Sequence, residues 1–318
     1  MTMPWRAPRV AASLLALGIV ACDAPPELAA AFRDDPSPQG TWPPPGGTLN
    51  TASLGATPLM RLLPPGSTID VPRVSDGIVS LIEVLDGDVY RPVTSVSAPQ
   101  GMLVLEADGE LYEGAAVVGS RWWLDDAHSH HVTIAEVSEQ GQAFGYQLEH
   151  RHGRADATEP VCKPDIDGDH WAYLVEDVLV DISSGTITAQ SGPVLVACAS
   201  GALGKAITWG FSPWSDGAPA SLALYQTGVR TVRADYCGDG SPHTQDGVLI
   251  QVFNELAGQS FVAPGQSTEA VFGPDGALCV STPRNEGADF ECDRPTCGGN
   301  PLTLMTADFH TWTKLAPS

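Results

Sequence analysis

Asp-Gly pairs recur along this chain beyond residue 70 and separate its short apolar runs. The pairs begin at positions 76, 86, 108, 167, 216, 239, 246 and 275. Such a pair favours a tight turn, because glycine accepts a positive φ and the aspartate side chain hydrogen-bonds to nearby backbone. Short runs bounded by turns are typical of strands. We therefore predict a mainly β fold with one or two helices, or alternatively an α+β fold, over residues 69–318.

The clearest strand pair covers residues 131–137 and 144–150. Phe144, Tyr146 and Leu148 alternate with polar residues in the second run. A period of two is typical of a half-buried strand. Because only a short connection separates the two runs, they are predicted to form a β-hairpin.

One segment has a helical period instead. Apolar residues recur at three- and four-residue steps, at Leu222, Tyr225, Val229, Val232 and Tyr236. This spacing places them on one face of a helix. Ser221 is a candidate N-cap, and Gly238 is a candidate stop. We predict a helix between these two residues.

The first 21 residues have the layout of a secretory signal peptide. Arg6 and Arg9 precede an uncharged run, residues 10–20, that is too short to span a bilayer. The segment ends in Ile-Val-Ala-Cys at residues 19–22, which resembles the lipobox of bacterial lipoproteins. We expect cleavage before Cys22 and lipid attachment to it, so that the exported chain is anchored to a bacterial membrane. An ordinary cleaved signal peptide is the alternative, and the inner and outer membranes both stay open.

Residues 22–68 are rich in proline, with runs at 43–45 and 64–65. Few apolar residues occur there in any periodic order, so burial cannot offset the entropy lost on ordering. The segment is predicted to be an extended tether between the membrane and the folded region.

The formal net charge of −22 argues against one class of partner. An acidic surface repels the phosphate backbone of nucleic acids. We therefore expect contact with the membrane through the lipid on Cys22 and no nucleic acid. An envelope protein or a glycan stays open as a further partner.

Six cysteines remain when Cys22 is set aside. They are Cys162, Cys198, Cys237, Cys279, Cys292 and Cys297. An even number in an exported chain predicts three disulfides. Six cysteines allow 15 pairings, and the sequence alone does not choose among them.

The run Arg-Ala-Asp-Tyr-Cys-Gly-Asp-Gly at residues 233–240, followed by His243-Thr244 and Asp246-Gly247, resembles the signature of the ADYC domain, a bacterial family. The resemblance extends over about residues 100–318. Upstream it includes Cys198, Gly204-Lys205 and the segment 209–214, and downstream it includes Gly276-Ala277, Cys279 and Pro283-Arg284. It implies an exported protein, often a lipoprotein, and it implies no particular activity. Family members carry two further cysteines where this chain has Ala206 and Gly228.

Four residues in and after this signature are candidates for chemistry: Asp235, Asp239, His243 and Asp246. Carboxylates and an imidazole brought together could hold a metal ion or transfer protons. Aspartate beside glycine more often shapes turns and accepts hydrogen bonds from backbone amides. The structural interpretation is therefore favoured, with Cys237 as part of a disulfide.

A second candidate is a calcium loop. Asp165, Asp167 and Asp169 alternate along the chain, and Glu176 occupies the twelfth position, as in a calcium-binding loop. His170 stands where the sharp turn of that loop requires glycine. A solvated acidic turn is the favoured interpretation.

A third candidate is a transition-metal site. Its residues are Asp125, Asp126, His128, His130 and His131, joined by His150 and His152 if the hairpin forms. Imidazole is a common ligand of zinc and copper. Strand alternation would place His128 and His130 on one face. Solvated surface histidines are the favoured alternative.

Aromatic residues at Trp122-Trp123 and in the segment 209–214 could bind glycans or peptides, although a place in a β core is favoured. The chain lacks the sequence patterns of a Ser nucleophile elbow, a zincin, a phosphate-binding loop and a dinucleotide site. We therefore expect a membrane-anchored envelope lipoprotein that acts as a binding or structural module and has no cofactor. The alternatives are a calcium or transition-metal ion, and an envelope hydrolase that uses Asp235, Asp239 and His243.

Overall fold

A computed structural model describes most of the chain beyond residue 47. The residues described are 48–55, 60–65, 77–79, 81–124, 127–140, 143–152, 158–165, 167–214, 218–247, 249–254, 268–285, 287, 289–298 and 311–315. All of them belong to one compact unit, Thr41–Ser318. The predicted signal peptide and Cys22 lie outside the described residues.

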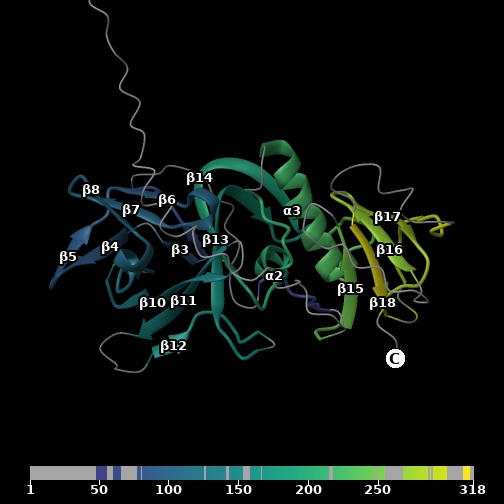
Figure 1. Ribbon diagram of the computed structural model, residues 1–318, viewed down its shortest axis with the longest axis horizontal. Coiled ribbons are helices and arrows are strands. Elements are labelled where there is room, and N and C mark those ends of the chain that lie inside the picture. The colour runs from purple at the N-terminus through teal and green to yellow at the C-terminus, as the bar shows by residue number, and fades with distance from the viewer. Residues whose placement is uncertain are drawn as a thin grey trace, which may run out of the picture. The chain divides into compact units, whose positions relative to one another are not determined.

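The described residues form three sheets, and the largest of them has ten strands (Figure 1). In spatial order they are β3 (Gly77–Val79), β2 (Met60–Leu62), β14 (Thr186–Cys198), β13 (Trp171–Asp181), β11 (Ala143–His152), β10 (His130–Gln140), β9 (Arg121–Trp123), β4 (Leu81–Asp86) and β5 (Val89–Pro92), while β12 (Thr158–Pro160) pairs with β11. The pairing is antiparallel except between β2 and β3. The predicted hairpin is confirmed as β10 and β11, in which Ile134 pairs with Leu148.

Smaller sheets and helices complete the fold. One sheet contains β6 (Ser95–Ser97), β7 (Val104–Ala107) and β8 (Glu110–Glu113); the other runs in the order β1 (Thr48–Leu49), β15 (Leu249–Phe253), β18 (Thr311–Leu315), β16 (Thr268–Gly273) and β17 (Gly276–Val280). The helices are α2 (Ala202–Thr208), α3 (Ala218–Arg233) and the 3-10 turns η1 (Pro99–Gly101) and η2 (Gly114–Val117). The chain is mainly β with two α-helices in the described residues, as predicted. No helix in these residues is long and apolar enough to cross a membrane.

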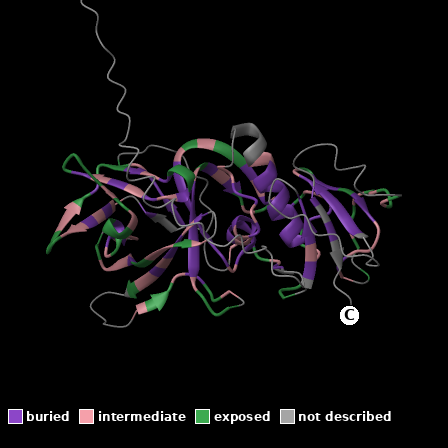
Figure 2. Cartoon of the chain, in the orientation of Figure 1, coloured by how far each residue is buried: buried purple, intermediate pink, exposed green. Residues whose placement is uncertain are grey.

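Strands β13 and β14 are buried on both faces and separate two apolar clusters. Tyr173 and Leu195 face the cluster that includes α2 and α3. Leu174 and Val196, one position further along each strand, face the cluster that includes β10 and β11. Figure 2 shows buried residues concentrated in β13 and α2. Double-sided burial explains why these strands read as nearly continuous apolar runs.

The predicted helix is present as α3, but both of its ends were predicted wrongly. It begins at Ala218, three residues before Ser221. It ends at Arg233, because Ala234 has a left-handed φ of 52°. The Asp235 N–H then bonds to the Arg230 carbonyl oxygen at 3.0 Å, and the Ala234 N–H bonds to that of Thr231 at 3.3 Å, which is a Schellman end. Tyr236 therefore lies beyond the helix.

Part of the predicted tether belongs to the folded region instead. Strand β1 pairs with β15, and β2 pairs with β14 and β3. Leu54, Met60 and Leu62 within this stretch are buried. The boundary at residue 69 was therefore wrong, because these short upstream segments pair with β14 and β15, which lie more than 100 residues further along the chain.

The six cysteines form three disulfides, as their even number predicts. The bonds are Cys162–Cys198, Cys237–Cys292 and Cys279–Cys297. The first joins the loop after β12 to the end of β14. The second joins Cys292 to Cys237 of the signature run, and the third joins Cys297 to Cys279 on β17.

Candidate functional site

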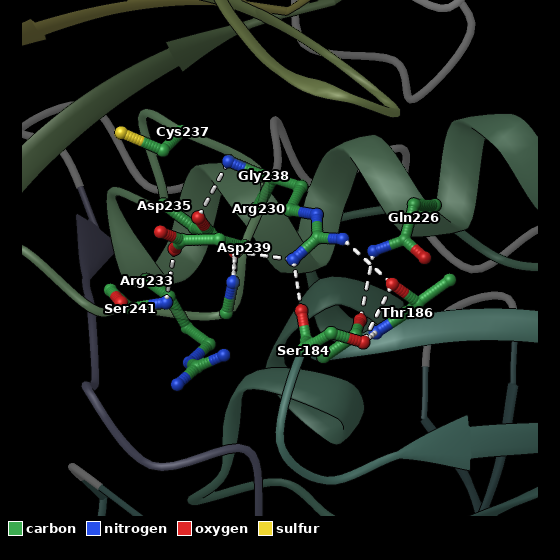
Figure 3. Close-up of polar contacts among 12 residues, drawn as sticks. Ser184, Thr186, Gln226, Arg230, Arg233, Asp235, Cys237, Gly238, Asp239 and Ser241 are labelled. Atoms are coloured by element: carbon green, nitrogen blue, oxygen red, sulfur yellow. Dashed lines mark hydrogen bonds and ion pairs between the residues drawn. The ribbon is translucent and has the colours of Figure 1, made fainter. Parts of the chain in front are cut away.

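The signature run, residues 233–240, begins at the last residue of α3, and Asp235 organises the turn that follows. Its carboxylate accepts hydrogen bonds from the Gly238 N–H at 2.8 Å and the Gly240 N–H at 2.9 Å (Figure 3). Asp235 is fully buried. Gly238 has a φ of +73°, and a Cβ there would lie 2.2 Å from the Asp275 carbonyl oxygen. The signature thus requires glycine at this position for both conformation and space.

Arg230 pairs with Asp235 inside the protein. The side chains of Arg230 and Asp235 are 3% and 0% exposed, respectively. Arg230 also donates to the carbonyl oxygen of Ser184 at 2.5 Å and to Thr186 Oγ1 at 3.2 Å (Figure 3). The guanidinium therefore joins the end of α3 to the connection between β13 and β14.

Tyr236 connects the signature to the five-stranded sheet that contains β16. Its hydroxyl donates to Glu269 Oε1 at 3.0 Å and accepts the Arg284 N–H at 2.6 Å. Its ring contacts the rings of Phe272 and Phe290. Burial is the main cause that raises the pKa of Tyr236 well above its usual value. The phenol therefore stays neutral and acts as a hydrogen-bonding group in the core.

Arg284 and Glu269 form a second buried ion pair, at 2.9 Å and with both side chains 0% exposed. The Arg284 guanidinium also donates to the carbonyl oxygens of Val232 and Thr231, both at 3.0 Å. These carbonyls lie in the last turn of α3. A cation at a helix C-terminus satisfies carbonyls that have no partner in the helix.

Residues 50–54, here named the strap, lie against the segment that follows the signature. The carboxylate of Asp246 accepts the Ala52 N–H and the Thr51 hydroxyl, both at 2.8 Å. Arg233 Nε donates to the Ala52 carbonyl oxygen at 3.0 Å. At the other end, the Leu203 N–H of α2 donates to the Leu54 carbonyl oxygen at 3.0 Å. The strap is thus hydrogen-bonded on one side to α2 and on the other to Arg233 in the signature and Asp246 after it.

Replacing Asp246 with alanine is expected to loosen the strap. The hydrogen bond from Ala52, and then that from Thr51, holds the pKa of Asp246 below its usual value. For such a depressed pKa the stabilisation is complete above the unfolded value and is lost as the pH falls through the folded value. At neutral pH, hydrogen exchange at Ala52 should become about fivefold faster, which corresponds to about 1 kcal/mol for bonds to an exposed carboxylate.

Two controls identify this effect. The difference between wild type and Asp246→Ala should shrink as the pH falls below the pKa of Asp246. Asp239→Ala should leave exchange at Ala52 unchanged, because Asp239 accepts the N–H of Ser241 instead. Equal exchange in wild type and Asp246→Ala at neutral pH would contradict the assignment of the strap contact.

The four residues predicted as a catalytic or metal cluster do not form one site. Asp235 is bound to Arg230 and two backbone amides, and Asp246 holds the strap. The backbone N–H of Ser241 is the main cause that lowers the pKa of the exposed Asp239. The ring of His243 stacks on Tyr236, with centroids 5.5 Å apart. The aspartates form turns or hold neighbouring backbone, as the favoured interpretation has it.

Residues 165–169 form an acidic turn, as the favoured interpretation predicted, and not the alternative calcium loop. Asp165 Oδ1 accepts the N–H groups of Asp167 at 2.9 Å and Asp169 at 3.0 Å, so it closes a turn on itself. Glu176 lies on β13, and burial is the main cause that raises its pKa. His170 contacts the Cys162 carbonyl oxygen. Within the described residues, no three or more His, Cys, Asp and Glu side chains are grouped closely enough to hold a metal ion.

The histidine-rich segment is divided between the two sides of the sheet. His128 precedes β10 with a φ of 52°, so strand alternation does not place it beside His130, contrary to the prediction. Its ring stacks on Trp123, with centroids 4.7 Å apart. The rings of His130 and His150 lie near each other, 5.9 Å apart. Asp125 and Asp126 lie outside the described residues.

The aromatic residues fill the core for the most part. Trp122, Trp209 and Phe211 are buried, as the favoured interpretation predicted. Trp214 is half-buried and packs against the same cluster as Trp209. Trp123 is also half-buried, and its indole N–H donates to Glu83 at 2.9 Å.

A pocket of about 370 Å³ adjoins the signature. It is lined by Thr186, Ile187, Leu222, Ala223, Gln226, Arg230, Gly238, Pro274 and Asp275. Gln226 is held in place, since its amide donates to the Gly185 carbonyl oxygen at 3.0 Å and accepts the Ile187 N–H at 2.6 Å. Neither Gln226 nor Arg230 was predicted from the sequence. Both lie on α3 among apolar residues, and charged or amide side chains give no local signal of burial.

The comparisons identify one related family. The family model of the ADYC domain matches residues 114–286, a shorter segment than the predicted 100–318. The matched segment includes both buried ion pairs and the Cys162–Cys198 disulfide, while Cys292 and Cys297 lie beyond it. A search of curated proteins found no match, and neither did a search of solved structures. Because the model matches more than half of the sequence and includes the signature, the chain belongs to the ADYC domain family.

Proposed function

We propose that the chain is a lipoprotein of the bacterial cell envelope, held to a membrane through lipid on Cys22, and that its ADYC domain is a binding or structural module. The proline-rich tether after Cys22 leads through β1 into the strap. The contact that carries the proposal is the one between the strap and Asp246 and Arg233. In an anchored protein, this contact would transmit force from the membrane attachment to the domain.

The disulfides support a place outside the cytoplasm. Three bonds among six cysteines are typical of proteins in oxidising compartments. An acylated cysteine behind a proline-rich spacer would then hold the domain at the membrane without a membrane-spanning helix. The charge of −22 favours a protein or glycan partner over nucleic acid.

The hydrolase alternative is less well supported, because its two aspartates already have other partners. A general acid or base needs a carboxylate that faces substrate. Asp235 is buried and accepts two backbone amides and Arg230. Asp239 is exposed and lies outside the lining of the pocket beside the signature. These roles suit a module whose signature maintains its own fold.

Replacing Cys22 with serine tests the anchor. We expect the wild-type chain in the membrane fraction, with metabolically incorporated palmitate and an N-terminal peptide whose mass includes the acyl chains. The Cys22→Ser chain should incorporate no palmitate, because serine offers no thiol for the thioether. Ala24→Ser, two residues downstream, is the matched control and should behave as wild type. A wild-type N-terminus with an unmodified thiol at Cys22 would contradict the proposal. Density-gradient separation of the two membranes would locate the anchored protein.

A further inference from the structure

The pocket beside the signature is built from three parts of the chain. Its walls come from α3, from the start of β14 and from the turn between β16 and β17, with Gly238 of the signature beside that turn. Arg230 Nε donates to the Pro274 carbonyl oxygen at 3.4 Å, and the Ala277 N–H donates to the Tyr236 carbonyl oxygen at 2.8 Å, so both contacts hold the turn in place. The pocket volume of about 370 Å³ lies within the roughly 300–1,000 Å³ of common ligand sites. The signature therefore helps to form a cavity that a side chain can enter.

Three of the four polar side chains that line this pocket already have partners (Figure 3). Gln226 bonds through its amide to two backbone groups. The Thr186 hydroxyl oxygen accepts a hydrogen bond from Arg230. The charge of Arg230 is balanced by the buried carboxylate of Asp235. These groups therefore present no unbalanced charge to a ligand.

Asp275 is the fourth polar residue of the lining, and its charge is not balanced. It lies in the turn between β16 and β17 and is exposed. Within the described part of the chain, its carboxylate has neither a hydrogen bond nor an ion pair. The field of a chain with a net charge of −22 also attracts cations. The charged group of a ligand in this pocket is therefore expected to be a cation.

The rest of the lining suits an aliphatic chain. Its apolar residues are Ile187, Leu222, Ala223 and Pro274. Leu222 and Ala223 are half-buried on α3, so they keep surface that a ligand can cover. Lysine and arginine bury their aliphatic stems on apolar surface while the charged head stays in water. A basic side chain therefore matches both the apolar wall and the carboxylate of Asp275.

We propose that this pocket binds a basic side chain, of lysine or arginine, that a partner protein presents. The stem lies against α3, and the cationic head pairs with the carboxylate of Asp275. This inference rests on the proposed role of the ADYC domain as a binding module and specifies the chemistry that the module recognises. An acidic side chain would be repelled by Asp275, and an apolar one would leave that carboxylate without a partner.

Titration with short peptides tests the proposal by nuclear magnetic resonance. The full mature chain is isotope-labelled and kept in detergent, and the amide signals of Ala223, Gly238 and Asp275 report on the pocket. The probe is acetyl-Gly-Lys-Gly-amide, and acetyl-Gly-norleucine-Gly-amide is its uncharged counterpart. We expect the three signals to shift and saturate with the lysine peptide. The norleucine peptide should bind about three- to fivefold more weakly, because it lacks an ion pair with an exposed carboxylate.

Three variants locate the binding. Asp275→Asn should weaken binding of the lysine peptide by the same factor and leave that of the norleucine peptide unchanged. Asp239→Asn is the matched control, because it removes the same charge from an exposed aspartate outside the pocket, and it should bind as wild type. Ala223→Met adds a long side chain to the wall and should weaken binding of both peptides. Near-ultraviolet circular dichroism of each variant must match wild type, so that the losses report on the pocket.

Four results would overturn the proposal. The first is the absence of saturable shifts with the lysine peptide, and the second is equal binding of the lysine and norleucine peptides. Equal effects of Asp275→Asn and Asp239→Asn would show a general attraction to an acidic surface. Tighter binding of acetyl-Gly-Glu-Gly-amide would assign the pocket to anions. Palmitate on Cys22 without peptide binding would exclude this pocket and leave the anchor intact, whereas peptide binding by a chain without lipid would do the reverse.

Discussion

Asp235→Ala is expected to lower the free energy of unfolding by about 3–5 kcal/mol, the usual cost of removing one partner from a buried ion pair. The substitution leaves the Arg230 guanidinium, 3% exposed, without its counter-ion. It also removes the acceptor for the N–H groups of Gly238 and Gly240. The signature turn and the connection between β13 and β14 should loosen together, because Arg230 links them. Denaturant unfolding without reductant measures the change.

Asp239→Ala is the matched control for this prediction. Asp239 belongs to the same run, but its side chain is exposed. Among the described contacts, it accepts a hydrogen bond from one backbone group outside its own residue, the Ser241 N–H. Its loss should cost no more than about 1 kcal/mol. Equal destabilisation by the two substitutions would show that the signature acts through its turn alone and that the buried pair contributes little. The comparison therefore separates the ion pair from the turn.

The parts of the fold that were predictable are those with strong local patterns. The hairpin of β10 and β11 alternates apolar and polar residues, and burial of Tyr146 and Leu148 on one face gives that pattern its physical cause. The helix period from Leu222 to Val232 likewise reflects packing of one face of α3. Its end was not predictable, because alanine rarely adopts the left-handed conformation of Ala234. The even number of cysteines predicted disulfides, but their pairing depends on the tertiary fold.

The long-range polar contacts were beyond local reasoning. Arg284 lies 48 residues from Tyr236 and 15 from Glu269, and sequence spacing contains no information about such pairs. The strap was missed for the same reason, since Thr51 and Asp246 are 195 residues apart. Asp235 was identified, but its role could be decided only by its partners. A buried carboxylate with two amide donors is a structural residue, whereas the same residue in an open cluster would suggest catalysis.

Arg284→Met is expected to destabilise the protein by about 3–5 kcal/mol, as the loss of one member of a buried ion pair does. Both side chains of the Arg284–Glu269 pair are 0% exposed. The substitution would remove the counter-ion of Glu269 in the core and leave the hydroxyl of Tyr236 as its remaining side-chain donor among the described contacts. It would also remove the donors to the carbonyl oxygens of Thr231 and Val232. Denaturant unfolding without reductant measures the loss.

A double-mutant cycle tests whether the charge or the volume of Arg284 matters. Glu269→Met alone should also be strongly destabilising, because it leaves the arginine without its counter-ion. The double variant should cost less than the sum of the single ones by about 1–3 kcal/mol, since it contains no unpaired buried charge. It should not reach wild-type stability, because two helix carbonyls and the Tyr236 hydroxyl still lose partners. Additive effects in the cycle would contradict this account and would assign the stabilisation to packing.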